Sequence, residues 1–292
     1  MSETSLFVTS TDARRTAPEY KNASIAVLDS GVGGLSILKE LHQQLPHDNF
    51  VFYADQAHVP YGQKTLAQVQ QYVEDITRFF LSGKFFNLPS VKLIVIACNT
   101  ASAAALHAVR KTFPYIQFVG MEPAIKPASQ HTQTGHIGVI ATAATFQGEL
   151  YASLLDRYAQ DVMVHKRACP EFVTLVERGE PYDEDDHLDV REALRPLVAA
   201  NIDQLVLGCT HFPFLKSVIA KELDVLGGRV ELIDPSPAVA RQAMRVLQQA
   251  DAMTTRGGNG STLYFTSGDT SHFTQQIQSL TEITSPDVQG VE

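Results

Sequence analysis

Two short segments share one pattern, and this pattern constrains the fold more than any other feature of the chain. Residues 93–102 read LIVIACNTAS, and residues 205–213 read LVLGCTHFP. In each segment an aliphatic run is followed by a small residue, a cysteine and then polar residues. Helical character follows both, so we predict two buried parallel strands with a thiol at the carboxyl end of each. Open α/β sheets bind ligands at that end of their strands.

The rest of the chain alternates between strand and helix patterns. We predict strands at 25–30, 49–55 and 91–97, with helices at 35–45 and 66–81 between them. This alternation predicts an α/β fold with a mainly parallel sheet. The segment TLYFTSG, residues 262–268, is expected to be the last strand.

A second half of the chain resembles the first. The segment 136–147, HIGVIATAATFQ, has the layout of IAVLDSGVGG, and Ile137 stands 112 residues after Ile25. Cys209 stands 111 residues after Cys98. Two strand and turn segments repeated at nearly the same spacing indicate an internal duplication.

Composition excludes several classes of function. The 292 residues carry a formal net charge of −9, which argues against general nucleic-acid binding. No apolar run approaches the roughly 18 residues of a membrane span, so no membrane partner is expected. Three cysteines without the spacing of a disulfide framework fit a reducing cytoplasm. Residues 1–21 are polar, lack a secretory signal and are expected to form a flexible tail.

The two cysteines allow a structural and a functional interpretation. A cysteine after an apolar strand is often a small buried hydrophobe, and we interpret Cys169, which lacks polar neighbours, in this way. The other two are followed by hydrogen-bonding side chains: Asn99 and Thr100 after Cys98, and Thr210 and His211 after Cys209. We expect the following helix to lower the pKa of each thiol through its free backbone N–H groups. These thiols are therefore candidate acid and base groups.

Other groups are expected at the same sheet edge. Asp29 and Ser30 end the first strand, where they could cap a turn or hold a thiol in position. Glycines 31, 33 and 34 are expected to let the backbone approach a small ligand. The ten histidines show no metal-ligand spacing, so no metal site is predicted, and His211 is interpreted as a proton partner.

The motifs DSGVGG, PYG, ACNTAS, EPAIKPA and GCTHFP occur in this order between Ile25 and Gly268. In this combination the chain resembles the glutamate racemases of the cofactor-independent Asp/Glu racemase family. The resemblance implies two similar α/β domains, each with a mainly parallel sheet flanked by helices, related by a pseudo-twofold axis with the active site in the cleft between them. We assign residues 22–119 and 232–292 to the first domain and residues 120–231 to the second.

The same resemblance implies interconversion of L- and D-glutamate without a cofactor, by a cytoplasmic homodimer. The D-isomer would serve peptidoglycan synthesis, and with it cell wall biogenesis and cell shape. Some family members respond to a cell-wall precursor, so such an effector, and a regulatory role for the tail, are expected here too.

Residue roles also come from the resemblance. Cys98 would take the α-proton from D-glutamate and Cys209 from L-glutamate, while Asp29, His211 and Glu177 would assist the thiols. The expected substrate contacts are Asp29, Ser30, Tyr61, Gly62, Asn99, Thr100, Thr145, Thr210 and His211. The chain departs from many relatives in ATAATFQ, where they carry a glycine before each threonine. This departure puts the shape of that loop in question, and not the thiols.

The chemistry requires such a pair. Inverting Cα takes a base on one face and an acid on the other, and a single group would tend to return the same proton. The chain shows no cofactor motif that would supply an electron sink, so hydrogen bonds in a dry, closed site must stabilise the carbanion-like transition state.

Two other functions remain open at this level. An aspartate or hydantoin racemase is the nearer alternative, although the Thr-His pair after Cys209 favours the glutamate branch. A redox-switched binding protein is the more distant one, and it predicts a disulfide between Cys98 and Cys209.

Overall fold

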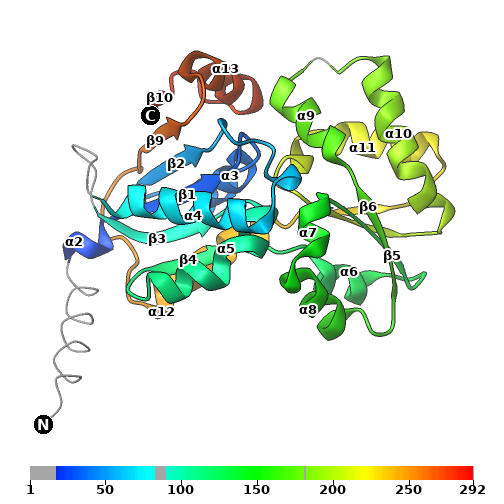
Figure 1. Ribbon diagram of the computed structural model, residues 1–292, viewed down its shortest axis with the longest axis horizontal. Helices are drawn as coiled ribbons and strands as arrows, with labels where there is room; N and C mark the ends of the chain where they lie inside the picture. The colour runs from blue at the N-terminus through cyan, green and yellow to red at the C-terminus, as the bar shows by residue number, and fades with distance from the viewer. Residues whose placement is uncertain (1–17, 83–89, 181, 292) are drawn as a thin grey trace, which may run out of the picture.

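The computed structural model describes residues 18–82, 90–180 and 182–291. Two parallel β-sheets lie side by side, each flanked by helices (Figure 1). Most of the predicted tail, residues 1–17, lies outside the described residues. Its last part, Pro18–Lys21, forms the short helix α2, where the Tyr20 hydroxyl donates a hydrogen bond of 3.2 Å to the Lys92 carbonyl. Among the described helices, none combines the length and apolar character needed to cross a membrane.

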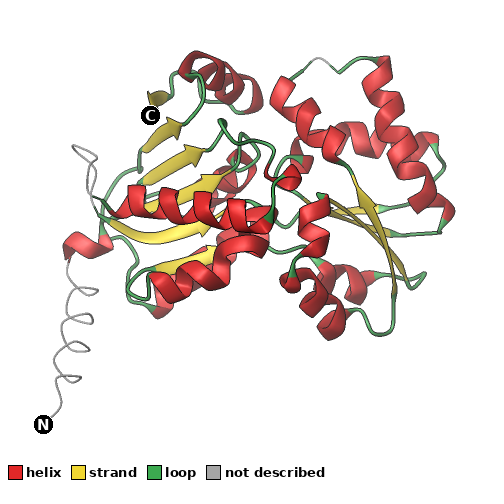
Figure 2. Ribbon diagram, viewed as in Figure 1, coloured by secondary structure: helices red, strands yellow, loops and turns green. Residues whose placement is uncertain are grey.

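The first sheet has the strand order β10-β9-β2-β1-β3-β4, and all neighbouring strands run parallel. Side chains alternate across it, so that Ile25 and Val27 of β1 belong to one core cluster while Ala26 and Leu28 belong to another. Helices α3, α12 and α13 cover the first face, and α4 and α5 cover the second (Figure 2). The strands are β1 Ser24–Asp29, β2 Phe50–Ala54, β3 Val91–Ile96, β4 Gln117–Gly120, β9 Thr262–Thr266 and β10 Asp287–Gly290. The helices are α3 Leu35–Gln44, η1 Tyr61–Gln63, α4 Leu66–Leu81, α5 Asn99–Thr112, α12 Ser236–Gln249 and α13 Thr270–Leu280.

The second sheet has the order β6-β5-β7-β8 and is also parallel throughout. Helices α6 and α8 pack on one face, and α9, α10 and α11 on the other. The strands are β5 His136–Ala141, β6 Met163–Ala168, β7 Gln204–Gly208 and β8 Glu231–Ile233. The helices are α6 Ile125–His131, α7 Ala143–Gln147, α8 Glu149–Tyr158, α9 Pro170–Arg178, α10 Glu184–Ala199, η2 Phe212–Leu215 and α11 Lys216–Val225.

The two sheets repeat one topology. The core of the first sheet has the order β2-β1-β3-β4, and the second sheet has the order β6-β5-β7-β8. In both, the strand that comes first in the sequence lies between the second and the third, and the fourth lies beyond the third. Cys98 and Cys209 each follow the third strand of their sheet. The α/β class with parallel sheets is confirmed, and the shared order supports the internal duplication.

One expectation needs revision at the carboxyl-terminal end. The prediction that 262–268 is the last strand is wrong, because α13 and β10 follow it. Polar residues fill most of α13, and β10 spans only four residues, so neither carries a strong apolar pattern. In addition, β8 pairs with β7, so the second sheet extends beyond residue 231. We propose that the chain returns to the first domain after Ile233.

Candidate active site

The first thiol lies in a chain of hydrogen bonds at the carboxyl edge of the first sheet. Cys98 immediately precedes α5, and its Sγ donates to Ser30 Oγ at 3.9 Å. Ser30 Oγ in turn donates to Asp29 Oδ1 at 3.3 Å. Asp29 is fully buried, and its Oδ1 also accepts from the Gly31 backbone N–H at 2.9 Å. The carboxylate thus holds both the loop after β1 and the hydroxyl that contacts the thiol.

The second thiol lies beside a histidine and a carboxylate. Cys209 Sγ is 3.6 Å from His211 Nδ1, and the opposite ring nitrogen, Nε2, is 2.7 Å from Glu177 Oε1. Cys209 and His211 come from the short segment between β7 and η2, whereas Glu177 lies in the last turn of α9. The three side chains form a Cys–His–Glu sequence in which the carboxylate orients the ring.

Hydrogen bonds between the two halves join these clusters. Thr210, which directly follows Cys209 in the sequence, donates from its Oγ1 to Asp29 Oδ2 at 2.9 Å. The Val32 backbone N–H donates to Glu177 Oε1 at 2.9 Å. Carboxylates of one half therefore bind groups of the other half next to both thiols, and the sequence-predicted catalytic residues gather in one place.

Two of the remaining predicted contacts, Thr100 and Thr145, form a hydroxyl cluster with Thr142. Thr100 Oγ1 lies 2.8 Å from Thr142 Oγ1 and 3.3 Å from Thr145 Oγ1, so α5 of the first half meets α7 of the second. Thr142 caps α7 by accepting from the Thr145 backbone N–H. A Cβ atom at Gly62 would lie 2.6 Å from the Thr142 Cβ, which shows how closely η1 packs on α7. In the ATAATFQ loop, both threonines therefore lie within hydrogen-bond distance of Thr100.

Asn99 differs from its neighbours in its hydrogen bonding. Its side chain is buried, and neither its Nδ2 nor its Oδ1 has a hydrogen-bond partner among the described residues. A buried amide without partners costs about 1–3 kcal/mol per unsatisfied group. A polar ligand at this place would recover that cost.

The glycines of the 31–34 loop leave space for side chains of the other half. A Cβ atom at Gly31 would fall on Glu177 Oε1, at 1.8 Å, and one at Gly33 would lie 2.5 Å from His211 Nδ1. These glycines therefore let the loop lie close to Glu177 and His211 of the other half. Because Gly31 and Gly33 have no Cβ atom, the Glu177–His211 pair can lie directly against the loop.

Burial decides the protonation of several groups. It raises the pKa of the Cys98 thiol, and the charges of Asp29 and Cys209 raise it further, so the expectation of a lowered pKa is wrong for this thiol. Burial likewise raises the pKa of the Asp29 carboxyl. The backbone N–H of Ala101 at the start of α5 does favour the Cys98 thiolate, but burial outweighs it. Cys98 is therefore favoured as the protonated thiol.

The His211–Glu177 pair has the opposite tendency. Burial opposes the charge on His211, but its hydrogen bonds to Cys209 and Glu177 outweigh this and raise its pKa well above 6.5. Burial also opposes the charge on Glu177, but the hydrogen bond and charge of His211, together with the bonds from Val32 and Gln276, outweigh it and lower the pKa of this carboxyl. The pair is thus an imidazolium bound to a carboxylate, beside the Cys209 sulfur.

Both thiols are almost closed off from solvent. Cys98 is 5% exposed and Cys209 is 6% exposed. Cys98, Cys169 and Cys209 are all free, so the disulfide that the redox alternative requires is not formed. Cys169 is fully buried in the core of the second half, consistent with the structural role predicted for it.

Sequence reasoning missed two residues around the site. Asp55 follows β2 at the same sheet edge as Asp29, and its Oδ2 accepts from the Tyr61 hydroxyl at 2.5 Å. The rule that placed Asp29 could have found it. Gln276 of α13 donates to the Glu177 carbonyl at 2.6 Å. It had no signal in the sequence, because α13 itself was not predicted.

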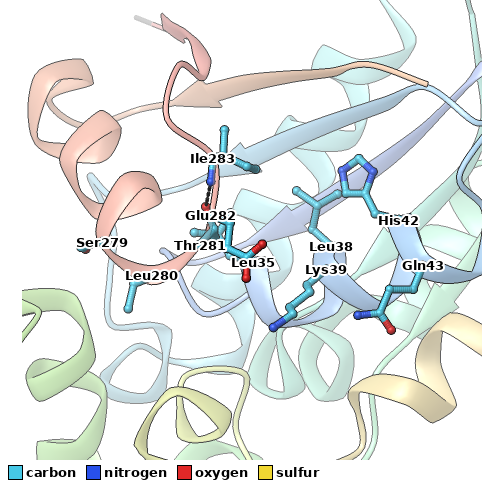
Figure 3. Close-up of a pocket in the computed structure, with 10 residues that line it drawn as sticks. All are labelled: Leu35, Leu38, Lys39, His42, Gln43, Ser279, Leu280, Thr281, Glu282 and Ile283. Carbon is cyan, nitrogen blue, oxygen red and sulfur yellow. Dashed lines mark hydrogen bonds between the residues drawn. The ribbon is translucent and has the colours of Figure 1, made fainter. Parts of the chain in front are cut away.

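A cavity of about 740 Å³ lies close by but is separate from the thiols. It is formed between α3 and the end of α13, and Leu35, Lys39, His42 and Leu280 are among the residues that line it (Figure 3). None of the predicted site residues lines it. The chemistry of the site therefore rests on the buried groups at the boundary of the two halves, not on this cavity.

Comparisons with known proteins agree with this geometry. The family described as Asp/Glu/Hydantoin racemase matches residues 25–243. The chain is 45% identical to the glutamate racemase of Herpetosiphon aurantiacus over 260 residues, which cover 89% of this chain and 98% of the relative. It is similar to the crystal structure of glutamate racemase from Francisella tularensis in complex with D-glutamate, with a TM-score of 0.79, 30% identity and coverage of 93% and 98%. It is also similar to Escherichia coli glutamate racemase in complex with L-glutamate and the activator UDP-MurNAc-Ala, with a TM-score of 0.74, 29% identity and coverage of 92% and 97%.

Proposed function

The chain belongs to the Asp/Glu/Hydantoin racemase family, and we propose that it is a glutamate racemase that interconverts L- and D-glutamate with two thiols. The observation that carries this proposal is the joining of Cys98 and Cys209, from two halves of one fold, by the Asp29–Thr210 hydrogen bond. Each thiol has its own polar partners, so the two can hold different protonation states. An acid and a base on opposite sides of Cα are what inversion requires.

The Cys209 side supplies the base for L-glutamate. Cys209 acts as this base beside His211, whose Nδ1 lies 3.6 Å from the sulfur, and Glu177 holds the ring in place through Nε2. The thiolate takes the α-proton, and it gives a proton back when the reaction runs from D-glutamate. Glu177 and His211 act as assisting groups because neither has to leave its hydrogen bonds during the transfer.

The Cys98 side supplies the acid in the same direction. Its pKa is raised by burial, so the thiol carries the proton that it delivers to the opposite face of Cα. In the reverse direction Cys98 is the base for D-glutamate, with Ser30 and Asp29 as its polar partners. The two sulfurs exchange roles after each turnover.

The substrate is proposed to bind through groups of both halves. Asn99 has unsatisfied amide atoms, the hydroxyls of Thr100 and Thr145 lie 3.3 Å apart, and the Thr210 hydroxyl bonds to Asp29. Tyr61 and Gly62 of η1 complete the set, with Asp29, Ser30 and His211. Hydrogen bonds to the carboxylates of glutamate would stabilise the negative charge that develops as the α-proton leaves.

Substrate entry requires the two halves to separate. The thiols are almost fully covered, and the contacts Thr210–Asp29 and Thr100–Thr142 run directly between the halves. Closure after binding would exclude water and strengthen the hydrogen bonds to the transition state.

In the cell, D-glutamate from this reaction is proposed to enter peptidoglycan synthesis in the cytoplasm, which supports cell wall biogenesis and cell shape. A homodimer is proposed from the family resemblance. The Escherichia coli relative binds the activator UDP-MurNAc-Ala, which supports a cell-wall precursor as an effector of this chain. Aspartate and hydantoins are the alternative substrates within this family, and activity assays must compare them with glutamate.

Incorporation of deuterium from solvent tests the function. In heavy water each glutamate enantiomer should gain deuterium at Cα, without added pyridoxal phosphate, and turnover of aspartate should be slower. Cys98→Ala and Cys209→Ala should each lower racemisation by at least about 100-fold. Cys169→Ala is the matched control, because it removes a buried thiol outside the site, and it should keep activity. Retention of the α-hydrogen by both enantiomers, or full activity of either site variant, would contradict the proposal.

A further inference from the structure

A second buried carboxylate lies at the edge of the first sheet, one strand away from Asp29. Asp55 directly follows β2, is 2% exposed, and its backbone N–H donates to the Asp29 carbonyl at 3.0 Å. The two thiols bond to Ser30 and His211 and not to Asp55, so the proton transfers described above do not explain its role. Its contacts with the Tyr61 turn indicate what it does.

Three side chains converge on the Asp55 carboxylate. The Tyr61 hydroxyl donates to Oδ2 at 2.5 Å, and the Ser267 hydroxyl donates to Oδ1 at 2.7 Å. His58 Nδ1 lies 2.9 Å from both oxygens, and its ring stacks on Tyr72 with centroids 3.9 Å apart. Donors from the loop after β2, from η1 and from the end of β9 thus fix the carboxylate on every side.

Tyr61 connects this carboxylate to the racemase site. The tyrosine is 1% exposed, and the charges of Asp55, Cys98 and Asp29 all act on its hydroxyl. The next residue, Gly62, packs against Thr142 of the second half, and Thr142 bonds to Thr100. A change in the tilt of Tyr61 would therefore move η1 against α7, at the boundary that must close over the substrate.

We propose that Asp55 is a positioning residue, which holds the Tyr61 hydroxyl and thereby sets η1 against α7 for substrate binding. The inference rests on the proposed function and adds a residue to it. Asp55 acts through Tyr61 and does not contact the reacting atoms. Its loss should weaken the binding of glutamate more than it slows the proton transfers.

A double-mutant cycle tests this inference. Asp55→Asn and Tyr61→Phe should each raise KM for both enantiomers about tenfold, the size expected for a charge-assisted hydrogen bond, with kcat changed by less than about twofold. If the carboxylate acts through the hydroxyl, the double variant should be no worse than either single variant. Effects that multiply to about 100-fold, a fall in kcat at constant KM, or unchanged kinetics would each overturn the proposal.

A control lies beside the same carboxylate. Asp75 lines a cavity of about 440 Å³ together with Asp55, His58 and Ser267, but its side chain is 59% exposed and bonds to Arg78. Asp75→Asn should keep the wild-type KM and kcat. If Asp55→Asn fails to fold, Tyr61→Phe decides alone, since an unchanged KM in that variant overturns the proposal. A wild type that does not racemise glutamate would instead contradict the proposed function, so the two failures are distinguishable.

Discussion

Replacement of Glu177 by glutamine tests the electrostatic account of the Cys209 side. Glu177 Oε1 accepts from both His211 Nε2, at 2.7 Å, and the Val32 backbone N–H, at 2.9 Å. Glutamine has nearly the same size and can still accept through its oxygen, so the packing of α9 against the 31–34 loop is kept. The negative charge that stabilises the His211 imidazolium is lost.

The expected magnitude follows from that single bond. A hydrogen bond to a charged group contributes about 1.5–3 kcal/mol and a neutral one about 0.5–1.5 kcal/mol, so the substitution should cost about 1–2 kcal/mol. This corresponds to a loss of about 5- to 30-fold in kcat/KM. The loss must be equal in both directions, because enantiomers have equal free energies in water and their equilibrium cannot favour either one.

A chiral assay of initial rates from each pure enantiomer measures this loss. The matched control is Glu171→Gln, which changes the same charge in the first turn of the same helix, away from the thiols, and should keep the wild-type kcat/KM. Thermal denaturation checks that the variants are folded. A folded Glu177→Gln enzyme with kcat/KM within about twofold of the wild type would refute the role assigned to the carboxylate.

A pH series and one further variant probe the same site. The free energy of unfolding of the wild type relative to Glu177→Gln should be largest between about pH 4.5 and pH 6.5. Because the pKa of Glu177 is lowered in the folded protein, its contribution to the free energy of unfolding is lost as the pH falls through that folded-state pKa. Because the pKa of His211 is raised, its contribution is lost as the pH rises through its own folded-state pKa. Denaturant titrations across this range measure the difference, and a difference that keeps growing toward alkaline pH would contradict the pairing. Asn99→Leu should raise the free energy of unfolding by about 1 kcal/mol, because it removes a buried amide without partners, and should raise KM for glutamate about tenfold or more. Lower stability with unchanged KM would show that this amide serves the fold instead.

Local sequence was sufficient to predict which polar residues lie at each strand end. The aliphatic runs before Cys98 and Cys209 are long enough to indicate buried strands, and β3 and β7 lie where these runs predicted them. Polar residues directly after such strands share one sheet edge in any parallel α/β fold, so Asp29 and Ser30 could be expected beside Cys98. The rule also applies to Asp55, whose partners His58 and Tyr61 lie nearby in the sequence, while Ser267 lies far along the chain.

Contacts between distant segments could not be predicted in the same way. Glu177 meets His211 only because α9 and the segment after β7 pack together, and Gln276 reaches Glu177 from a helix whose polar composition hid it. The glycines at 31 and 33 could be recognised as small residues, but not as space for these side chains.

The sequence by itself determined the parallel strands, the duplicated order and the position of each thiol at a strand end, because these depend on apolar patterns within short segments. Only the tertiary structure decided which thiol is kept protonated by burial and which lies beside an imidazolium. The physical reason is that desolvation and charge act through space. They depend on every group that packs around Cys98 and Cys209, and most of those groups come from other parts of the chain.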